Sequence, residues 1–187
     1  MRVASYKLHE GYTLGRDSSR PRAAENNMEG LIYMGKEQVR AYLDSIGRHD
    51  LPIMEFAKSS ATVQLAAAAV GVPPAQIAKT LALRIKEQIV VVVLGGEARL
   101  CNKKLKQHFG AKAKMLTAAE TYEVTGHAVG GVCPFGLKTP LPIYLDASLR
   151  AYNIMYPAGG ESNSAVPIVV EEMAEITGGT WVDISES

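Results

Sequence analysis

The segment KTLALRIKEQIVVVVL, residues 79–94, places two strand-forming runs only three polar residues apart. The first run alternates between two faces, whereas the second is apolar throughout, which is typical of a more deeply buried strand. A connection as short as KEQ allows the two runs to pair as an antiparallel hairpin. We therefore expect a β-hairpin whose second strand is the more buried of the two.

Helical patterns flank this hairpin on both sides. Residues 36–46 carry apolar side chains at helical spacing ahead of Gly47, which is placed to end a helix. A second helix is predicted to begin after Ser60, as its N-cap, and to end at Gly71, because two prolines follow.

Further helices are predicted in the second half of the chain. A basic helix is expected from Asn102, as N-cap, to Gly110, and Thr117 with Glu120 has the spacing of a capping box for the next helix. A last helix is expected from Glu171, among short strands in residues 143–184. Hairpins with interspersed helices favour an α+β fold over a regular βαβ array.

Length and composition indicate one globular domain. The chain has 187 residues, of which 47% are hydrophobic, and the polar, turn-rich residues 1–35 are predicted to be an N-terminal extension of a domain at 36–187. The longest apolar run, residues 89–94, is too short to cross a membrane, and no signal-peptide pattern begins the chain. We therefore expect a cytoplasmic protein with no membrane partner.

Cysteines and histidines show no metal-binding pattern. Cys101 and Cys133 lack C-x-x-C spacing, and the four histidines lack the pairings of metal hydrolases. The sequence therefore predicts no metal and no other cofactor. The net charge is only +1, but Arg99, Lys103, Lys104, Lys106, Lys112 and Lys114 follow one another without an acidic residue. Such a run is usually a solvated helix face, although it can also contact phosphates.

Lys79 heads the apolar row of the first hairpin strand. Its stem can pack while the ammonium reaches water, which is the commoner arrangement. Alternatively, the cation lies at the mouth of a pocket, where it holds a phosphate, a carbonyl or a developing oxyanion. Both interpretations require the same strand.

The stretch TGHAVGGVCPFGLKTP, residues 125–140, combines flexible and kinked backbone. Gly130 and Gly131 suit either a wide turn or the close approach of a ligand to the main chain. His127 is a candidate general base but more often such a residue is structural, and Cys133 has no recognisable base beside it. A second loop, residues 157–164, offers Ser162 and Asn163 as hydrogen-bonding groups for a substrate or for their own turn, and Thr62 is a candidate donor at a helix start.

In chain order these segments resemble the YbaK/EbsC family, which is related to the editing domain of bacterial prolyl-tRNA synthetases. The resemblance rests on VPPAQIAKTLAL, GGEARL, LKQHFGAKAKML, TGHAVGGVCPFG, IYLDASL and AGGESNSAVPIVV, and it extends from about residue 36 to residue 183. It implies an α+β fold with a mixed, barrel-like sheet surrounded by helices. It also implies a trans-editing enzyme that deacylates mischarged aminoacyl-tRNA.

The resemblance assigns roles to particular residues. The family's key lysine corresponds to Lys79, and its first glycine-rich segment corresponds to Gly126, Gly130, Gly131, Pro134 and Gly136. Its later glycine turn corresponds to Gly159 and Gly160. Cys133 stands where many relatives carry serine, and GGESNS replaces a more basic turn.

These assignments lead to one mechanistic hypothesis. Lys79 and main-chain N–H groups around Gly130 and Gly131 orient the terminal adenosine and the ester, and a small pocket admits short side chains. Residues 62, 127, 133, 134, 136, 159, 160, 162 and 163 are then expected to contact the substrate, and residues 99, 103, 104 and 106 the tRNA. The expected substrate is tRNA for proline carrying a small non-cognate amino acid, and prolyl-tRNA synthetase is a candidate partner. The alternatives are a non-catalytic tRNA- or synthetase-binding module, or an ester hydrolase that uses Cys133.

Overall fold

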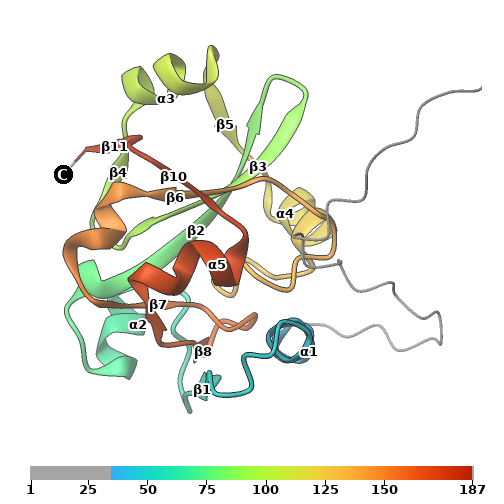
Figure 1. Ribbon diagram of the computed structural model, residues 1–187, viewed down its shortest axis with the longest axis vertical. Helices are drawn as coiled ribbons and strands as arrows, with labels where there is room; N and C mark the ends of the chain where they lie inside the picture. The colour runs from blue at the N-terminus through green and yellow to red at the C-terminus, as the bar shows by residue number, and fades with distance from the viewer. Residues whose placement is uncertain (1–34, 187) are drawn as a thin grey trace, which may run out of the picture.

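The computed structural model describes residues 35–186. The predicted extension, residues 1–35, lies outside these residues except for Gly35, so its boundary stays a prediction. Within the described part, five α-helices and three 3-10 turns surround a curled sheet (Figure 1). The helices are α1 (Lys36–Ser45), α2 (Val63–Val70), α3 (Asn102–Phe109), α4 (Ala118–Thr125) and α5 (Met173–Thr177), and the turns are η1 (Pro74–Gln76), η2 (Ala147–Ala151) and η3 (Val170–Glu172).

The main sheet is mixed and has the strand order β10-β6-β3-β2-β7-β9, with β5 also paired to β2. These strands are β2 (Ile77–Ile85), β3 (Gln88–Gly95), β5 (Ala113–Met115), β6 (Ile143–Asp146), β7 (Ile154–Pro157), β9 (Ile168–Val169) and β10 (Thr180–Val182). Two further pairs join β1 (Met54–Glu55) to β8 (Ser164–Ala165) and β4 (Arg99–Leu100) to β11 (Ser185–Glu186). The predicted α+β fold with a mixed, barrel-like sheet is confirmed.

The predicted hairpin forms the centre of this sheet. Strands β2 and β3 pair antiparallel over eight residue pairs, with Lys79 opposite Leu94 and Ile85 opposite Gln88. Residues 90–94 of β3 are completely buried, whereas β2 keeps several half-buried positions. The uninterrupted apolar run is therefore explained by burial of both faces of β3.

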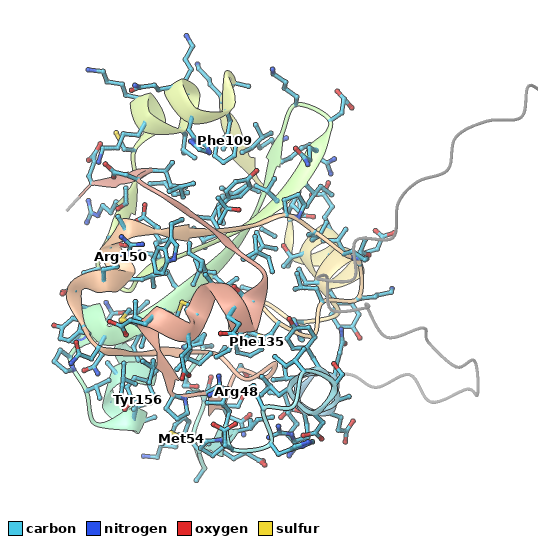
Figure 2. The ribbon with its side chains drawn as sticks, viewed as in Figure 1. Arg48, Met54, Phe109, Phe135, Arg150 and Tyr156 are labelled. Atoms are coloured by element: carbon cyan, nitrogen blue, oxygen red, sulfur yellow. The ribbon has the colours of Figure 1, made fainter. Side chains whose placement is uncertain are left out.

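The two faces of the hairpin contribute to two hydrophobic clusters. Ala78 and Val93 belong to the larger cluster, which packs against α1 and α5 and includes the completely buried Leu43 and Phe135 (Figure 2). Leu83 and Val92 belong to the smaller cluster, which packs against α3. Because successive side chains of a strand point to opposite faces, one hairpin can serve both clusters.

Two predicted N-caps are wrong, whereas the capping box is confirmed. Helix α2 is capped by Thr62, whose Oγ1 accepts from Leu65 N at 3.2 Å, because Ser60 donates instead to Ser162 O. Helix α3 starts at Asn102 itself, since the carbonyl of Cys101 already accepts the first helical hydrogen bond, from Leu105 N.

The predicted capping box at the start of α4 closes in both directions, and Gly71, Gly110 and Gly126 end their helices in the left-handed conformation, as the sequence indicated. Gly47 has a positive φ one residue after the C-cap of α1.

A buried carboxylate fixes the C-terminal strand. Asp146, at the end of β6, is completely buried and accepts from Ile184 N at 2.8 Å, Ser185 Oγ at 2.6 Å and Ser148 N at 3.0 Å. Burial alone would raise the pKa of Asp146, but these hydrogen bonds outweigh it and the pKa is lowered. Through this carboxylate, β11 is held against β4, next to the turn that follows β3.

Replacing Asp146 tests this anchor. Asp146→Asn keeps the shape of the side chain but turns an amide NH₂ toward at least one donor, so the free energy of unfolding should fall by about 1–3 kcal/mol in urea titrations. The matched variant Asp183→Asn removes a carboxylate that pairs with Lys104 on the surface, and it should change stability little. Equal losses in the two variants would contradict the role given to Asp146.

Candidate active site

A small cavity lies where β2 has an open edge. Its volume is about 190 Å³. Four segments meet there: the start of α2, the strand β2, the glycine loop (residues 125–140) and the segment from β7 to β8. Lys79 and Gly130, predicted to act together, both line it. The other lining residues are Ser60, Ala61, Thr62, Val63, Ala66, Ile77, Ala78, Thr80, Leu81, Val129, Val132, Tyr156, Ala158, Ser164 and Ala165.

The open edge follows from the pairing of β2. On the side away from β3, β7 pairs with Ile77 and Ala78, and β5 pairs with residues 83–85. Among the described residues, no strand pairs with residues 79–82 on that side. The carbonyl of Ala82 points to this edge, where it accepts from Leu116 N, so the main-chain groups of Thr80 point to the same edge. Backbone polar groups of Thr80 therefore face the cavity wall.

The Lys79 ammonium is held in place by main-chain carbonyls. Its Nζ donates to Gly96 O at 2.9 Å and also to Ala98 O. Burial lowers the pKa of Lys79, and the nearby charge of Arg99 lowers it further. Because an ammonium has three donors, one N–H remains for a ligand after these two bonds.

Gly96 brings this ammonium close to helix α2. A Cβ at Gly96 would lie 2.1 Å from Pro74 O and 2.6 Å from Val63 Cγ1, so no larger residue fits there. Val63 lines the cavity. The lysine is thus neither free in water nor deep in the core, but fixed at the rim of the cavity.

The glycine pair 130–131 mainly allows loops to touch. A Cβ at Gly130, where φ is 94°, would lie 2.8 Å from Ala61 Cβ, and one at Gly131 would lie 2.8 Å from the main chain of Glu161. Gly131 N donates to Ala128 O at 2.9 Å, which is the turn expected as the simpler interpretation. Only Gly130 of the pair lines the cavity, so its N–H is the better candidate donor.

Four predicted substrate contacts lie outside the cavity lining. His127 and Cys133 are completely buried in the core, and Pro134 is also buried. Cys133 Sγ donates to Phe135 O at 3.2 Å and lies 3.5 Å from His127 Nε2, and burial raises the pKa of Cys133 to about 12. Gly136 packs against α1, since a Cβ there would lie 2.8 Å from Gln38 O. These residues shape the loop from behind because their side chains are needed for packing.

The later glycine loop also contacts protein more than the cavity. A Cβ at Gly159 would meet Ile53, and one at Gly160, where φ is 98°, would lie 2.5 Å from the main chain of Gly35. Ser162 O accepts from Ser60 Oγ at 3.1 Å, and Asn163 Nδ2 donates to Phe56 O at 3.2 Å. The cavity is lined instead by Ala158, Ser164 and Ala165, on either side of these residues.

Several lining residues were missed by the sequence analysis. Val63 and Ala66 have i, i+3 spacing on α2, which is a signal for a shared face, but Val129 and Tyr156 carry no local signal. Thr80 is next to Lys79, and its Oγ1 is buried with no hydrogen-bond partner among the described residues. The predicted residue Thr62 does line the cavity, while its Oγ1 serves as the N-cap of α2.

The basic segment divides into free and paired cations. Arg99, Lys103 and Lys106 are exposed, and Arg99 lies close enough to Lys79 to affect its pKa. Lys104 instead donates to Asp183 at 2.6 Å and to Ser185 O at 2.8 Å. Its charge is therefore largely used within the protein.

Two further searches concern residues 35–186 only. No group of three or more histidine, cysteine, aspartate or glutamate side chains in this part could hold a metal ion. Each helix in the same part is too short or too polar to cross a membrane.

Comparison with known proteins gives one family model, described as an aminoacyl-tRNA editing domain, which matches residues 57–176. The chain is 40% identical over 153 residues to "Uncharacterized protein YwhH" of Bacillus subtilis (strain 168), covering 81% of this chain and 97% of that protein. It is 26% identical over 146 residues to "Putative Cys-tRNA(Pro)/Cys-tRNA(Cys) deacylase EbsC" of Enterococcus faecalis (strain ATCC 700802 / V583), covering 75% and 89%.

A solved structure has a similar fold. It is titled "Crystal structure of a putative trans-editing enzyme for prolyl tRNA synthetase", and the TM-score is 0.77 at 31% sequence identity. The similarity covers 84% of this chain and all of the solved one. It therefore extends over most of the described fold.

The buried His127 predicts a specific sensitivity to acid. Burial lowers the pKa of His127, although hydrogen bonds to the carbonyls of Phe135 and Gly136 partly oppose this. Below a pH of about 6.5 the unfolded chain binds a proton that the folded chain refuses, so the free energy of unfolding falls by up to about 1.4 kcal/mol per pH unit until the lower, folded-state pKa is reached.

Urea titrations between pH 8 and pH 5 measure this loss. The stability difference between the wild type and His127→Gln should shrink as the pH falls. A difference that stays constant over this range would show that His127 is not held neutral.

Proposed function

The chain belongs to the family of aminoacyl-tRNA editing domains, and from this premise we propose that it hydrolyses the ester between a small, wrongly attached amino acid and tRNA. The observation that carries the proposal is that Lys79 and Gly130, on separate segments, line one small cavity at an open strand edge. We further propose that the enzyme acts in trans on tRNA for proline. The printed names of a relative, which include Cys-tRNA(Pro), and of a similar structure, which include prolyl tRNA synthetase, support this choice.

The proposed reaction uses no protein nucleophile. Water attacks the ester carbonyl carbon, the oxyanion collapses, and the bond to the ribose oxygen breaks, releasing the amino acid and a tRNA with a free hydroxyl. The remaining N–H of Lys79 and the N–H of Gly130 are the donors placed to hold the carbonyl oxygen or the terminal ribose. Fixed donors of this kind stabilise developing charge without reorganising during the reaction.

The lining of the cavity favours short amino acids. Five of its lining residues are alanines, at positions 61, 66, 78, 158 and 165, and their walls enclose about 190 Å³. A bulky side chain fails to enter such a space, which is an easier discrimination than one between isosteres. Alanine, serine and cysteine are therefore the proposed acyl groups.

Cys133 does not support a rival function as a nucleophile. Its thiol is completely buried, does not line the cavity, and has a pKa raised to about 12, so almost no thiolate exists near neutral pH. A non-catalytic tRNA- or synthetase-binding module is the remaining alternative, and turnover assays with purified protein separate it from an enzyme.

Single-turnover hydrolysis of alanyl-tRNA for proline tests the role of Lys79. Lys79→Ala should lower the rate about 100- to 1,000-fold, the usual cost of losing one fixed donor to an oxyanion, while circular dichroism shows a folded protein. Cys133→Ala should stay within about threefold of the wild type, since the thiol only packs. An unchanged rate in Lys79→Ala, or an equal loss in Cys133→Ala, would refute the proposed mechanism.

The difference between Lys103 and Lys104 tests the proposed tRNA surface. Lys103→Ala removes an exposed cation, so tRNA affinity should fall and the slope of log K against log salt should decrease by about one. Lys104→Ala removes a cation already paired with Asp183, so it should change the slope less. Filter binding at several salt concentrations measures both, and a larger effect at Lys104 would count against this surface.

A further inference from the structure

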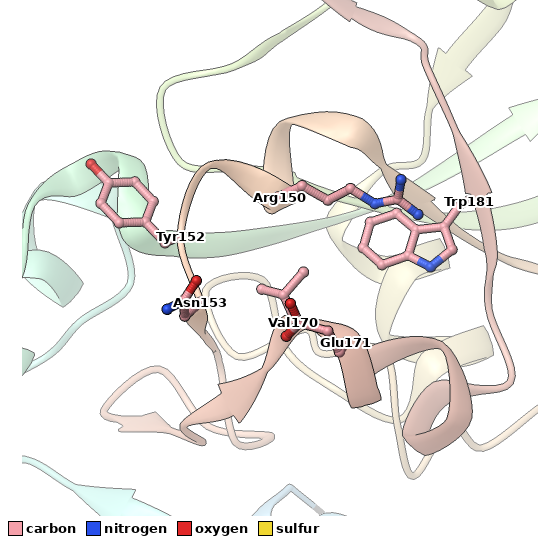
Figure 3. A pocket seen from close by; sticks show the side chains of 6 residues that line it. All are labelled: Arg150, Tyr152, Asn153, Val170, Glu171 and Trp181. Carbon is pink, nitrogen blue, oxygen red and sulfur yellow. The ribbon is translucent and has the colours of Figure 1, made fainter.

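A second hollow lies beside the proposed active site, and its lining is aromatic and polar (Figure 3). Its volume is about 380 Å³, within the range of small-molecule sites. Trp181 of β10 and Arg150 of η2 stand at one end of it and Tyr152 at the other, as Figure 3 shows. Asn153, Val170 and Glu171 complete the lining. The reaction proposed above uses none of these residues.

The two aromatic rings of this hollow are fixed from behind. Trp181 and Tyr152 are partly buried and pack against the larger hydrophobic cluster. The Arg150 guanidinium lies over the Trp181 ring, 4.2 Å from its centroid. Flat aromatic and guanidinium surfaces held in this way are the groups on which unpaired bases of single-stranded RNA stack.

Three polar side chains of the hollow are available to a ligand. Arg150, Asn153 and Glu171 all line it, and the structure of residues 35–186 gives their side chains no hydrogen bond or ion pair. Together they offer guanidinium donors, an amide and a carboxylate acceptor. Cytosine matches this set, because its amino group can donate to a carboxylate while its ring oxygen and nitrogen accept from the other two.

The hollow and the cavity are connected by one short segment. Tyr152 and Asn153 line the hollow, and Tyr156, three residues later on β7, lines the cavity. Three residues of extended strand span about 10 Å. On the other side, Ser148 of η2 accepts from Gly95 N at 3.0 Å, next to the Gly96 carbonyl that holds Lys79. The two sites are thus neighbours.

We propose that this hollow binds an unpaired cytosine of the tRNA 3′ end, next to the terminal adenosine whose ester lies in the cavity. A tRNA ends in the single-stranded sequence CCA, so its cytosines directly precede the nucleotide that carries the amino acid. The base stacks on the Arg150 and Trp181 pair or on Tyr152, and Glu171 accepts from its amino group. This proposal rests on the proposed function for the identity of the RNA, but binding in the hollow can be measured without any turnover.

Trp181 is the only tryptophan of the chain, so its fluorescence reports on the hollow directly. The RNA trinucleotide CCA should quench it in a saturable manner and bind more tightly than UUA. Arg150→Ala should weaken CCA about tenfold, and Glu171→Ala should abolish the preference over UUA. As a charge control, Lys86→Asn removes an exposed cation at the far end of the hairpin, where asparagine tolerates the φ of 54°, and it should bind like the wild type. Absence of quenching, or equal affinities of wild type and Arg150→Ala, would overturn the proposal.

Hydrolysis of two substrates tests the same hollow independently. Trp181→Leu should raise KM for alanyl-tRNA about tenfold and leave kcat unchanged, whereas hydrolysis of 3′-alanyl-adenosine, which has no cytosine, should not change. Equal losses on both substrates would indicate a folding defect or a role in the cavity, and would overturn the proposal. If the wild type hydrolyses neither substrate, the proposed function fails, and the fluorescence result still decides whether the hollow binds CCA.

Discussion

The hydrogen bonds from the Lys79 ammonium to the carbonyls of Gly96 and Ala98 fix the geometry on which the proposed chemistry depends. A lysine side chain has many rotamers, and ordering it without a partner costs up to about 2 kcal/mol of entropy. Here two carbonyls of the turn after β3 hold it, and that turn is itself supported by the pairing of β4 with β11. The carboxylate of Asp146 secures β11, so a buried ion at the end of β6 supports the placement of a cation at the cavity rim.

The cavity exists because β2 is paired along only part of one edge. Strands β7 and β5 pair with its two ends and leave residues 79–82 facing α2 and the two glycine-bearing loops. Gly131 and Gly160 let these loops approach neighbouring main chain more closely than any side chain would allow. Glycine here contributes mainly to shape, and only the N–H of Gly130 is a candidate donor to the substrate.

Local patterns predicted the elements well because their causes are local. The alternation in residues 79–85, the apolar run in 89–94 and the capping box at Thr117 each reflect contacts within one hairpin or one helix turn. The N-cap at Ser60 was wrong because a distant residue, Ser162, takes its hydroxyl.

For the same reason, no pattern indicated that Lys104 would pair with Asp183 or that Tyr156 would line the cavity. The resemblance of the motifs identified Lys79 and Gly130. The placement of His127 and Cys133 in the core depends on three-dimensional packing that spacing does not encode.

The account requires that Lys79 and Gly130 contact one ligand at the same time. An NMR titration with a non-hydrolysable amide analogue of 3′-alanyl-adenosine measures this directly, through the ¹³Cε signal of Lys79 and the amide signal of Gly130. Both signals should shift together and saturate with one common Kd, while the buried Cys133 thiol remains protonated. Shifts confined to other parts of the molecule, or different Kd values for the two signals, would contradict a shared site.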